Sequence, residues 1–177
     1  GLTLGQDQLF VTLSYGFVLS LDPRTGEKKW SQRLSGAGNT VPVFDDGLVY
    51  LVSGDSKAWA ISANNGRIKW KIDAIGNDTN LISNNAPATS KKYAVFGFGN
   101  GEIYTTFKKG GYVLWSSSLS GRNDGRVISA IDDIVASPVI VGRNVFVADG
   151  SGKVVSLKVE SGDRNWTAPF GSSGNLW

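Results

Sequence analysis

The side chains that most often carry enzyme chemistry are missing from this sequence. Its 177 residues include no His and no Cys, which removes the usual general base, the commonest metal ligand and the thiolate nucleophile. A Ser-His-Asp triad, a zinc hydrolase site and a haem site with a histidine ligand are therefore excluded. Asp55, Asp73 and Asp149 lie near predicted turns and could face a central channel, but each is also explained by a role in its turn or in solubility. We predict no catalytic residue, no metal site and no cofactor.

Two further patterns point away from nucleotides and nucleic acids. The run Gly97-Phe98-Gly99-Asn100-Gly101 lies between two predicted strands, whereas a dinucleotide-binding glycine loop opens a helix. The net charge is a mild +3, and the Lys and Arg residues are scattered through turns. Nucleic-acid-binding proteins concentrate such charge on one face, so we expect no nucleic acid partner. No apolar run approaches the roughly 18 residues that a membrane span needs.

A long repeat organises the chain. Four copies of Gly-x-x-x-Trp occur, and their tryptophans are 40, 45 and 51 residues apart, which is the period of a four-stranded propeller blade. The glycines and tryptophans are Gly26 and Trp30, Gly66 and Trp70, Gly111 and Trp115, and Gly162 and Trp166. A proline recurs at a constant distance from the repeat glycine. Pro42, Pro87 and Pro138 each lie 24 residues before the glycine of their copy.

Each copy predicts four strands. The first is short and holds the proline, the second is β-branched and aromatic, and the fourth holds the tryptophan. The third follows a glycine-rich hairpin and carries a small residue six places before the repeat glycine. These small residues are Ser20, Ala60, Thr105 and Ser156. We expect all four repeat tryptophans to be core residues, each packed against an adjacent blade near the small third-strand residue, and Trp59 to be buried as well.

The fold class that follows is all-β, a β-propeller of four-stranded blades with about four blades in this chain. We expect residues 1–177 to form a single propeller segment, with blades at about 1–40, 41–85, 86–136 and 137–177. Two insertions interrupt the period. The distance from tryptophan to the next proline is 12 residues after the first copy, 17 after the second and 23 after the third. In repeat proteins such insertions often mark the binding face, although loop length can also drift without consequence.

The repeat resembles a known family. The stretch Ser20-Leu21-Asp22-Pro23-Arg24-Thr25-Gly26-Glu27-Lys28-Lys29-Trp30 is similar to the repeat of pyrroloquinoline-quinone (PQQ)-type propellers. The stretches 85–89, 97–103 and 126–140 resemble the BamB family, the propeller lipoproteins of the outer-membrane β-barrel assembly machinery. This resemblance implies half of an eight-bladed ring and a non-enzymatic scaffold that binds the central protein, BamA. It also implies the periplasmic face of the outer membrane, with a lipid anchor outside this segment.

The resemblance places partner contacts in the two insertions. Leu81 and Asp133 match positions that the family uses to meet its partner. The arginine expected after Leu81 is Ile82, and the second acidic position after Asp133 is Val135, so the charged surface is only half present. Asp132 is a candidate substitute for the missing acid. The alternative is that Asp132 and Asp133 are ordinary solvated loop residues.

Two other functions stay open. One is a fragment of a PQQ-dependent quinoprotein dehydrogenase, although the resemblance to those enzymes implies an adjacent cysteine pair that this sequence lacks. The other is a propeller module that binds an unknown ligand. Four blades in an open arc would expose an apolar face at each end. Two copies pairing head to tail, or further blades of a longer protein, would cover these faces. Because Trp177 falls where the first strand of a next blade should begin, we expect a segment of a longer protein.

Overall fold

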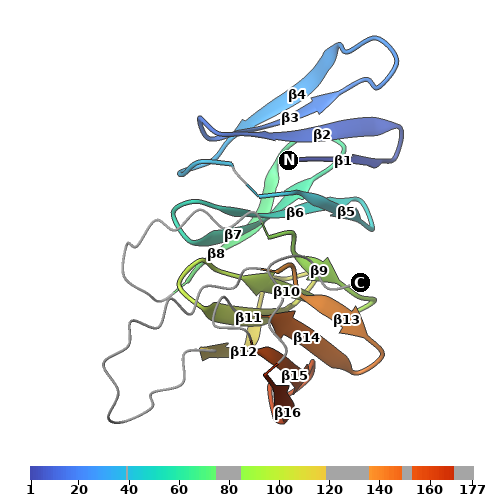
Figure 1. The fold of residues 1–177 in the computed structure, drawn as a ribbon. Helices are drawn as coiled ribbons and strands as arrows, with labels where there is room; N and C mark the ends of the chain where they lie inside the picture. The colour runs from blue at the N-terminus through green and yellow to red at the C-terminus, as the bar shows by residue number, and fades with distance from the viewer. Residues whose placement is uncertain (39, 75–84, 119–135, 149–152, 170–177) are drawn as a thin grey trace.

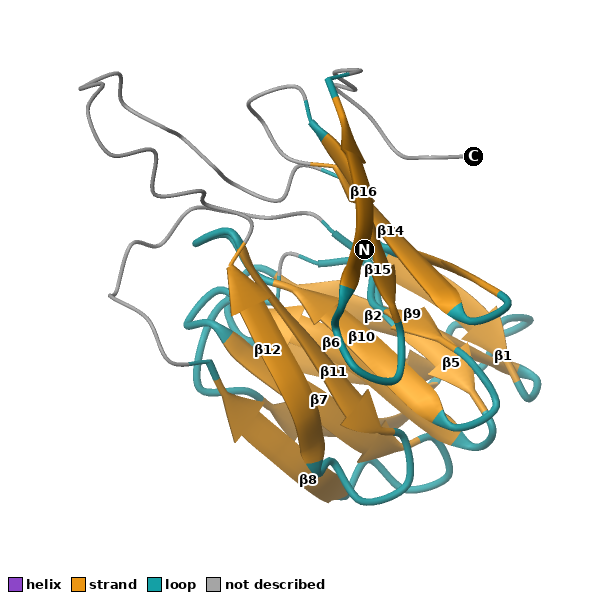
Figure 2. Ribbon diagram, turned by 90° about the horizontal axis from the view of Figure 1, so that it is seen from below, coloured by secondary structure: helices purple, strands orange, loops and turns teal. Residues whose placement is uncertain are grey.

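The structure is a computed structural model that describes residues 1–38, 40–74, 85–118, 136–148 and 153–169. In this part of the chain the regular elements are all strands (Figure 2). They form four four-stranded antiparallel sheets, and within each sheet the strands lie side by side in chain order. The sheets follow one another as successive blades, with the first and the fourth at opposite ends of the stack (Figure 1). The predicted all-β propeller fold is confirmed.

The sixteen described strands divide evenly among the blades. Blade 1 comprises β1 (Leu2–Gly5), β2 (Gln8–Leu13), β3 (Phe17–Leu21) and β4 (Lys28–Arg33). Blade 2 comprises β5 (Val43–Asp45), β6 (Leu48–Ser53), β7 (Lys57–Ser62) and β8 (Ile68–Asp73). Blade 3 comprises β9 (Ala88–Thr89), β10 (Tyr93–Gly97), β11 (Glu102–Phe107) and β12 (Val113–Ser118). Blade 4 comprises β13 (Val139–Val141), β14 (Asn144–Ala148), β15 (Val154–Lys158) and β16 (Arg164–Ala168).

The first strands form the inner side of the arc. β1 contacts β5, β5 contacts β9, and β9 contacts β13. Pro42, Pro87 and Pro138 lie directly before β5, β9 and β13, not inside these strands as the sequence pattern suggested. Proline has no N–H to donate to a ladder, so the strand begins at the next residue.

The turn between the third and fourth strands is built identically in every blade. In blade 1 the N–H of Gly26 donates to the carbonyl of Asp22, and the N–H of Asp22 donates to the carbonyl of Glu27, each at 2.8 Å. The other three blades form the same pair of hydrogen bonds. The repeat glycine has a φ between +70° and +76° in all four copies, a left-handed conformation that glycine adopts without steric cost.

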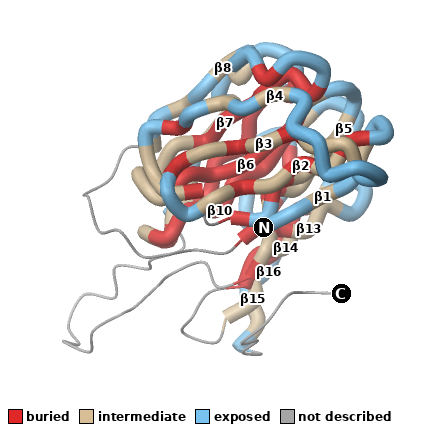
Figure 3. Tube along the Cα trace, turned by 90° about the horizontal axis from the view of Figure 1, so that it is seen from above, coloured by how far each residue is buried: buried red, intermediate tan, exposed pale blue. Residues whose placement is uncertain are grey.

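The core lies between the blades. Three buried clusters occupy the three blade interfaces, with Phe10, Val49 and Ile61 in the first, Tyr50, Phe96 and Tyr104 in the second, and Val95, Val145 and Leu157 in the third. In blade 2, β6 and β7 each carry five consecutive buried residues, because this sheet is covered on both faces. In blade 1, β2 alternates between buried and half-buried residues, because only one of its faces is covered (Figure 3).

Three of the repeat tryptophans join neighbouring blades. Each ring N–H donates to a carbonyl of the following blade: Trp30 to Ala63 at 2.8 Å, Trp70 to Lys108 at 3.1 Å and Trp115 to Val159 at 2.9 Å. Each acceptor lies three residues before the next repeat glycine. A Cβ added to Gly66, Gly111 or Gly162 would come within 2.6 Å of the preceding blade's tryptophan ring. The repeat glycine is therefore required both by its φ and by the indole that lies against it.

This arrangement corrects two expectations about the tryptophans. They do pack against the adjacent blade, but on its turn glycine and not near its small third-strand residue. The small residue is instead the cross-strand partner within the same sheet, as in the pairs Ser20–Trp30 and Ala60–Trp70. Trp166 is not a core residue, because no described sheet follows blade 4, and it is 46% exposed. Trp59 is buried, as expected.

A β-bulge precedes each tryptophan. In blade 1, Ser20 pairs with Trp30 while the adjacent Leu21 pairs with Lys28, so Lys29 is the extra residue on β4. The register shifts at the same place in the other three blades. Bulges bend a strand and redirect its side chains, and here the extra residue lies next to the indole that reaches the neighbouring sheet.

Candidate partner-binding surface

One end of the blades carries the connections from each blade to the next, and we call it the connection end. Because the strands are antiparallel, the hairpins between second and third strands, such as residues 54–56 and 98–101, lie at this same end. The two inserted segments follow the fourth strands β8 and β12, so both begin at the connection end. Leu81 and Asp133 lie outside the described residues, as do Ile82, Asp132 and Val135. Their role as partner contacts stays a prediction.

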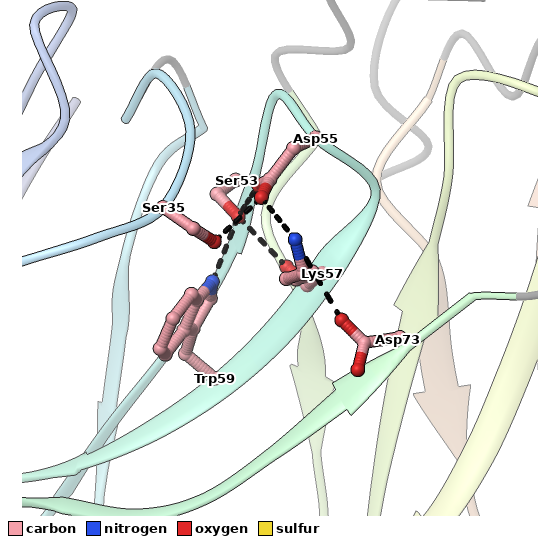
Figure 4. Close-up of polar contacts among 6 residues, drawn as sticks. All are labelled: Ser35, Ser53, Asp55, Lys57, Trp59 and Asp73. Carbon is pink, nitrogen blue, oxygen red and sulfur yellow. Dashed lines mark hydrogen bonds and ion pairs between the residues drawn. The ribbon is translucent and has the colours of Figure 1, made fainter. Parts of the chain in front are cut away.

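A polar cluster centred on Asp55 lies at the connection end. Asp55 occupies the hairpin between β6 and β7 and accepts three hydrogen bonds of 2.5 Å (Figure 4). The donors are the hydroxyls of Ser35 and Ser53 and the ammonium of Lys57. Ser35 belongs to the connection between blades 1 and 2. One carboxylate therefore joins the hairpin of blade 2 to the chain that enters that blade.

The cluster extends to the strand that precedes the first insertion. Lys57 Nζ lies 3.7 Å from a carboxylate oxygen of Asp73, the last residue of β8. The indole N–H of Trp59 donates to Ser53 Oγ at 2.7 Å, which anchors the hairpin to the buried third strand. The Asp55 cluster thus comprises Ser35, Ser53, Asp55, Lys57, Trp59 and Asp73 (Figure 4). It links the hairpin to the end of β8, from which the first insertion departs.

Local backbone geometry brings these residues together. The N–H of Gly54 donates to the carbonyl of Ala37 at 2.8 Å, which ties the hairpin to the incoming connection. Ser56 has a φ of +55° and occupies the place that Gly16 and Gly101 occupy in blades 1 and 3. A Cβ on Gly36 would overlap the carboxylate of Asp55. Glycine at 36 therefore lets the connection approach closely enough for Ser35 to reach Asp55.

The cluster contains an ion pair that is charged at neutral pH. Burial acts to raise the pKa of Asp55, but hydrogen bonds from Lys57, Ser35 and Ser53, together with the charge of Lys57, outweigh it and lower the pKa below its usual value. The hydrogen bond to Asp55 raises the pKa of Lys57, against a smaller opposing effect of burial. Both shifts stabilise the charged forms. Because Asp55 and Lys57 both stay charged at neutral pH, the pair is better suited to stabilising the hairpin between β6 and β7 than to transferring a proton.

Both carboxylates of this cluster have partners within the blade or its connection. Asp55 accepts hydrogen bonds from three donors, and Asp73 lies 3.7 Å from Lys57 Nζ. Asp149 lies outside the described residues. Within the described ranges, no group of three or more acidic side chains is placed to hold a metal ion.

A second ion pair lies at the opposite end of the blades, and this one joins two blades. The side chain of Lys108 is 5% exposed, and its ammonium lies 2.9 Å from Asp45 and 3.8 Å from Asp46. The backbone carbonyl of Lys108 accepts two hydrogen bonds, one from the Trp70 ring N–H at 3.1 Å and one from the Tyr50 hydroxyl at 3.4 Å. Burial, with a smaller effect of the Asp45 and Asp46 charges, raises the pKa of that hydroxyl. This group joins blades 2 and 3 and is structural.

Sequence reasoning did not find either ion pair. One signal was available for Lys108, which stands three residues before a repeat glycine. Pro23, Ala63 and Val159 occupy the same position in the other copies, so a lysine there is an exception. For Asp55 and Ser35 no such signal exists, because the hydrogen bond between them joins a hairpin to an irregular connection 20 residues away.

Comparison with known proteins adds three findings. The family model described as "Outer membrane protein assembly factor BamB" matches residues 1–177. The protein of that name from Moranella endobia is 23% identical over 176 residues, which cover 99% of this chain and 45% of that protein. The crystal structure of BamB from Moraxella catarrhalis matches with a TM-score of 0.84 and 18% identity, over 99% of this chain and 54% of that chain.

The same fold occurs in enzymes. A quinohemoprotein alcohol dehydrogenase from Comamonas testosteroni matches with a TM-score of 0.76 and 16% identity, over 97% of this chain and 35% of that chain. At this identity the likeness concerns the fold alone. This chain spans less than half the length of the BamB proteins from Moranella endobia and Yersinia pestis, two of the curated relatives that it matches.

Proposed function

Because this chain belongs to the BamB family of outer membrane protein assembly factors, we propose that it is a non-enzymatic scaffold in the assembly of outer membrane proteins. The match of the family model over residues 1–177 is the observation that carries this proposal. We further propose that its partner is the central barrel-assembly protein, BamA. Leu81 and Asp133, in the two insertions that begin at the connection end, are the proposed contacts.

The structure of the connection end supports this proposal. Binding residues are commonly placed on loops that a rigid scaffold positions. Here the scaffold is a set of sheets joined by buried interfaces, and the Asp55 cluster contacts the end of β8, from which the first insertion departs. The second insertion, within 116–137, leaves from the corresponding strand of blade 3. Both insertions therefore start from neighbouring blades at one end of the molecule.

We propose that the protein acts at the periplasmic face of the outer membrane, through a lipid anchor outside this segment. In the described part of the chain no helix is long and apolar enough to cross a membrane. The name shared by the relatives supports the outer membrane as the site of action. A quinoprotein dehydrogenase is the less favoured alternative, because Asp55 and Asp73 are held in ion pairs with Lys57.

A binding titration tests the proposal. The 177-residue chain is titrated against the isolated periplasmic domains of a BamA-type protein by calorimetry, alongside the variants Asp133→Arg and Leu81→Asp. Glu27→Arg is the matched control, because it reverses an exposed acid in the turn between β3 and β4, at the opposite end of the blades. Circular dichroism of each variant confirms that the sheets are retained.

The proposal predicts saturable binding that each insertion variant weakens by about tenfold or more, which corresponds to roughly 1.4 kcal/mol. Glu27→Arg should bind as tightly as the parent chain. Absence of binding by folded protein would refute the choice of partner. Binding that Glu27→Arg weakens as much as Asp133→Arg does would refute the assignment of the contact to the connection end.

A further inference from the structure

The end of the blades opposite the connection end carries two turns from each blade, and we call it the turn end. One turn joins the first strand of a blade to the second, and the other joins the third strand to the fourth. Blades of a propeller stack through the faces of their sheets, so a further blade would not lie on this end. The turns of blade 3 therefore stay at the surface however many blades stand beside it.

Blade 3 differs from the other described blades in the charge of these two turns. Its turns carry only cations, namely Lys91, Lys92, Lys108 and Lys109. The other blades have acidic residues in the corresponding turns: Asp7, Asp22 and Glu27 in blade 1, Asp46 in blade 2, and Glu160 and Asp163 in blade 4. Lys108 is buried and paired with Asp45. The other three lysines are exposed, and no carboxylate among the described residues forms an ion pair with them.

The fold brings these exposed lysines together. The backbone N–H of Lys108 donates to the carbonyl of Lys92 at 2.8 Å, which holds the two turns of blade 3 side by side. Blades 2 and 4 join their two turns by the same hydrogen bond. Lys91 and Lys92 therefore lie beside the turn that carries Lys109. Charges from separate parts of the sequence form one basic surface.

Exposed aromatic rings lie on the same turn and next to it. Tyr112, the last residue of the second turn, is 76% exposed, and Phe107, just before that turn, is 46% exposed. A Cβ added to Gly110 would lie 2.7 Å from the Tyr112 ring, so this ring lies over the turn beside Lys109. The Phe107 ring packs on the ring of Tyr93, with ring centres 5.8 Å apart.

The turn itself does not require these rings. The other blades have polar or charged residues at the two positions: Asp22, Ser62 and Lys158 in place of Phe107, and Glu27, Arg67 and Asp163 in place of Tyr112. Those blades nevertheless form the turn with the same pair of hydrogen bonds. Exposed aromatic residues that a fold does not need are candidates for an interaction surface.

We propose that this lysine–aromatic surface, formed by Lys91, Lys92, Phe107, Lys109 and Tyr112, binds the anionic headgroups of a phospholipid membrane. Lysines are attracted to anionic lipid, and tyrosine is enriched where a membrane meets water because one end of its ring is apolar and the other polar. The charge of the surface is complementary to such headgroups. Turns at the end of a blade can also reach a flat bilayer without a groove to receive the ligand.

The position of this surface is compatible with the proposed partner. A membrane contact at the turn end leaves the connection end, where the inserted segments begin, free for BamA. The membrane contact rests on the proposed function for its setting at the outer membrane, but the vesicle experiment that tests it contains no BamA. Failure to bind vesicles would therefore leave the calorimetric titration standing, and failure of that titration would leave vesicle binding standing.

Sedimentation of the 177-residue chain with lipid vesicles tests the proposal. Vesicles of equal parts phosphatidylglycerol and phosphatidylcholine present anionic headgroups, and vesicles of phosphatidylcholine alone do not. The chain should bind the first kind and show no measurable binding to the second. Binding should weaken as salt is added, because at about 0.1 M salt exposed charges are screened beyond about 10 Å.

Two variants of equal net charge locate the contact. The test variant replaces the three exposed lysines of the surface: Lys91→Gln, Lys92→Gln and Lys109→Gln. The control replaces three exposed cations on the outer strands of blades 1 and 2: Arg33→Gln, Lys69→Gln and Lys71→Gln. The test variant should bind anionic vesicles about 100-fold more weakly, at about fivefold for each lysine. The control should bind nearly as tightly as the parent chain, and Tyr112→Ala should weaken binding several-fold with no change of charge.

All the replaced residues are exposed, so the fold should survive, and circular dichroism checks this for each variant. Equal binding to both kinds of vesicle would contradict a role for the anionic headgroup. Equal losses in the test variant and the control would show that net charge drives binding and not this surface. A folded chain that binds neither kind of vesicle would refute the membrane contact, and its binding to polyglutamate would instead assign the surface to an acidic polypeptide.

Discussion

Replacing Gly66 by alanine should destabilise the fold much more than replacing Gly47. Both glycines lie in blade 2 turns and have nearly the same φ, +71° and +76°. Alanine at either position takes a left-handed conformation at a cost of about 1–2 kcal/mol, partly offset by a less flexible unfolded chain. At Gly47 a Cβ meets nothing within 4 Å, but at Gly66 it meets three ring atoms of Trp30 at 2.6, 2.8 and 3.2 Å.

The difference between the two variants can be worked out from these contacts. Ordinary Cβ contacts lie at 3.4–4 Å, so the indole must move by close to 1 Å. Such overpacking costs about 1–3 kcal/mol, and the movement strains the 2.8 Å hydrogen bond from Trp30 to Ala63. We expect a loss of about 1 kcal/mol in the free energy of unfolding for Gly47→Ala. For Gly66→Ala we expect about 2–4 kcal/mol.

Urea unfolding followed by circular dichroism measures both losses. A double-mutant cycle isolates the contact, because Gly66→Ala should cost only its conformational strain in a Trp30→Ala background. Equal losses for Gly47→Ala and Gly66→Ala, or an unchanged cost of Gly66→Ala without the indole, would refute the assignment of this glycine to the joint between blades.

Two further predictions concern the ion pairs. Asp45→Asn should lower the free energy of unfolding by about 1–3 kcal/mol, because it leaves the buried Lys108 ammonium without its nearest charged partner. Lys108→Met should lower it less, because this variant also removes the buried charge. A larger loss for Lys108→Met than for Asp45→Asn in urea unfolding would contradict this prediction. Asp55→Asn should lower stability by about 1–2 kcal/mol at neutral pH. Because the folded pKa of Asp55 is lowered, its stabilisation is complete above the unfolded value near 4 and fades as pH falls through the folded value. The difference between parent and variant should therefore shrink below about pH 4, and a constant difference down to pH 2 would contradict the pairing. The pKa of Lys57 is raised in the folded protein, so its effect on stability has the opposite pH dependence. The stabilisation by Lys57 is complete below the unfolded pKa of about 10.4 and is lost as pH rises through the pKa of the folded state.

Much of the fold could be predicted from the sequence. The Gly-x-x-x-Trp spacing, with the β-branched and aromatic run and the glycine-rich hairpin of each copy, predicted four-stranded units, and the described residues form four such sheets. These features are local, since each strand and turn depends on residues a few places apart. The turn at Gly26 is an example, because its two hydrogen bonds lie within residues 22–27.

The candidate site was predictable only in outline. The insertions and their location after a fourth strand were visible as a change in spacing, but the cluster around Asp55 was not. Ser35 and Asp55 meet because Gly36 allows the connection to approach the hairpin. No periodic pattern encodes such a meeting between an irregular segment and a turn.

The sequence by itself therefore determined the units of this protein, and the tertiary structure decided how they join. Glycine at 66 could be read from the sequence as a turn residue, yet its second role appears only when the indole of Trp30 lies against it. The same sequence pattern produces a half-buried Trp30 and an exposed Trp166. The physical reason is that burial of a blade face depends on whether another sheet stacks on it, which residues within the blade do not specify.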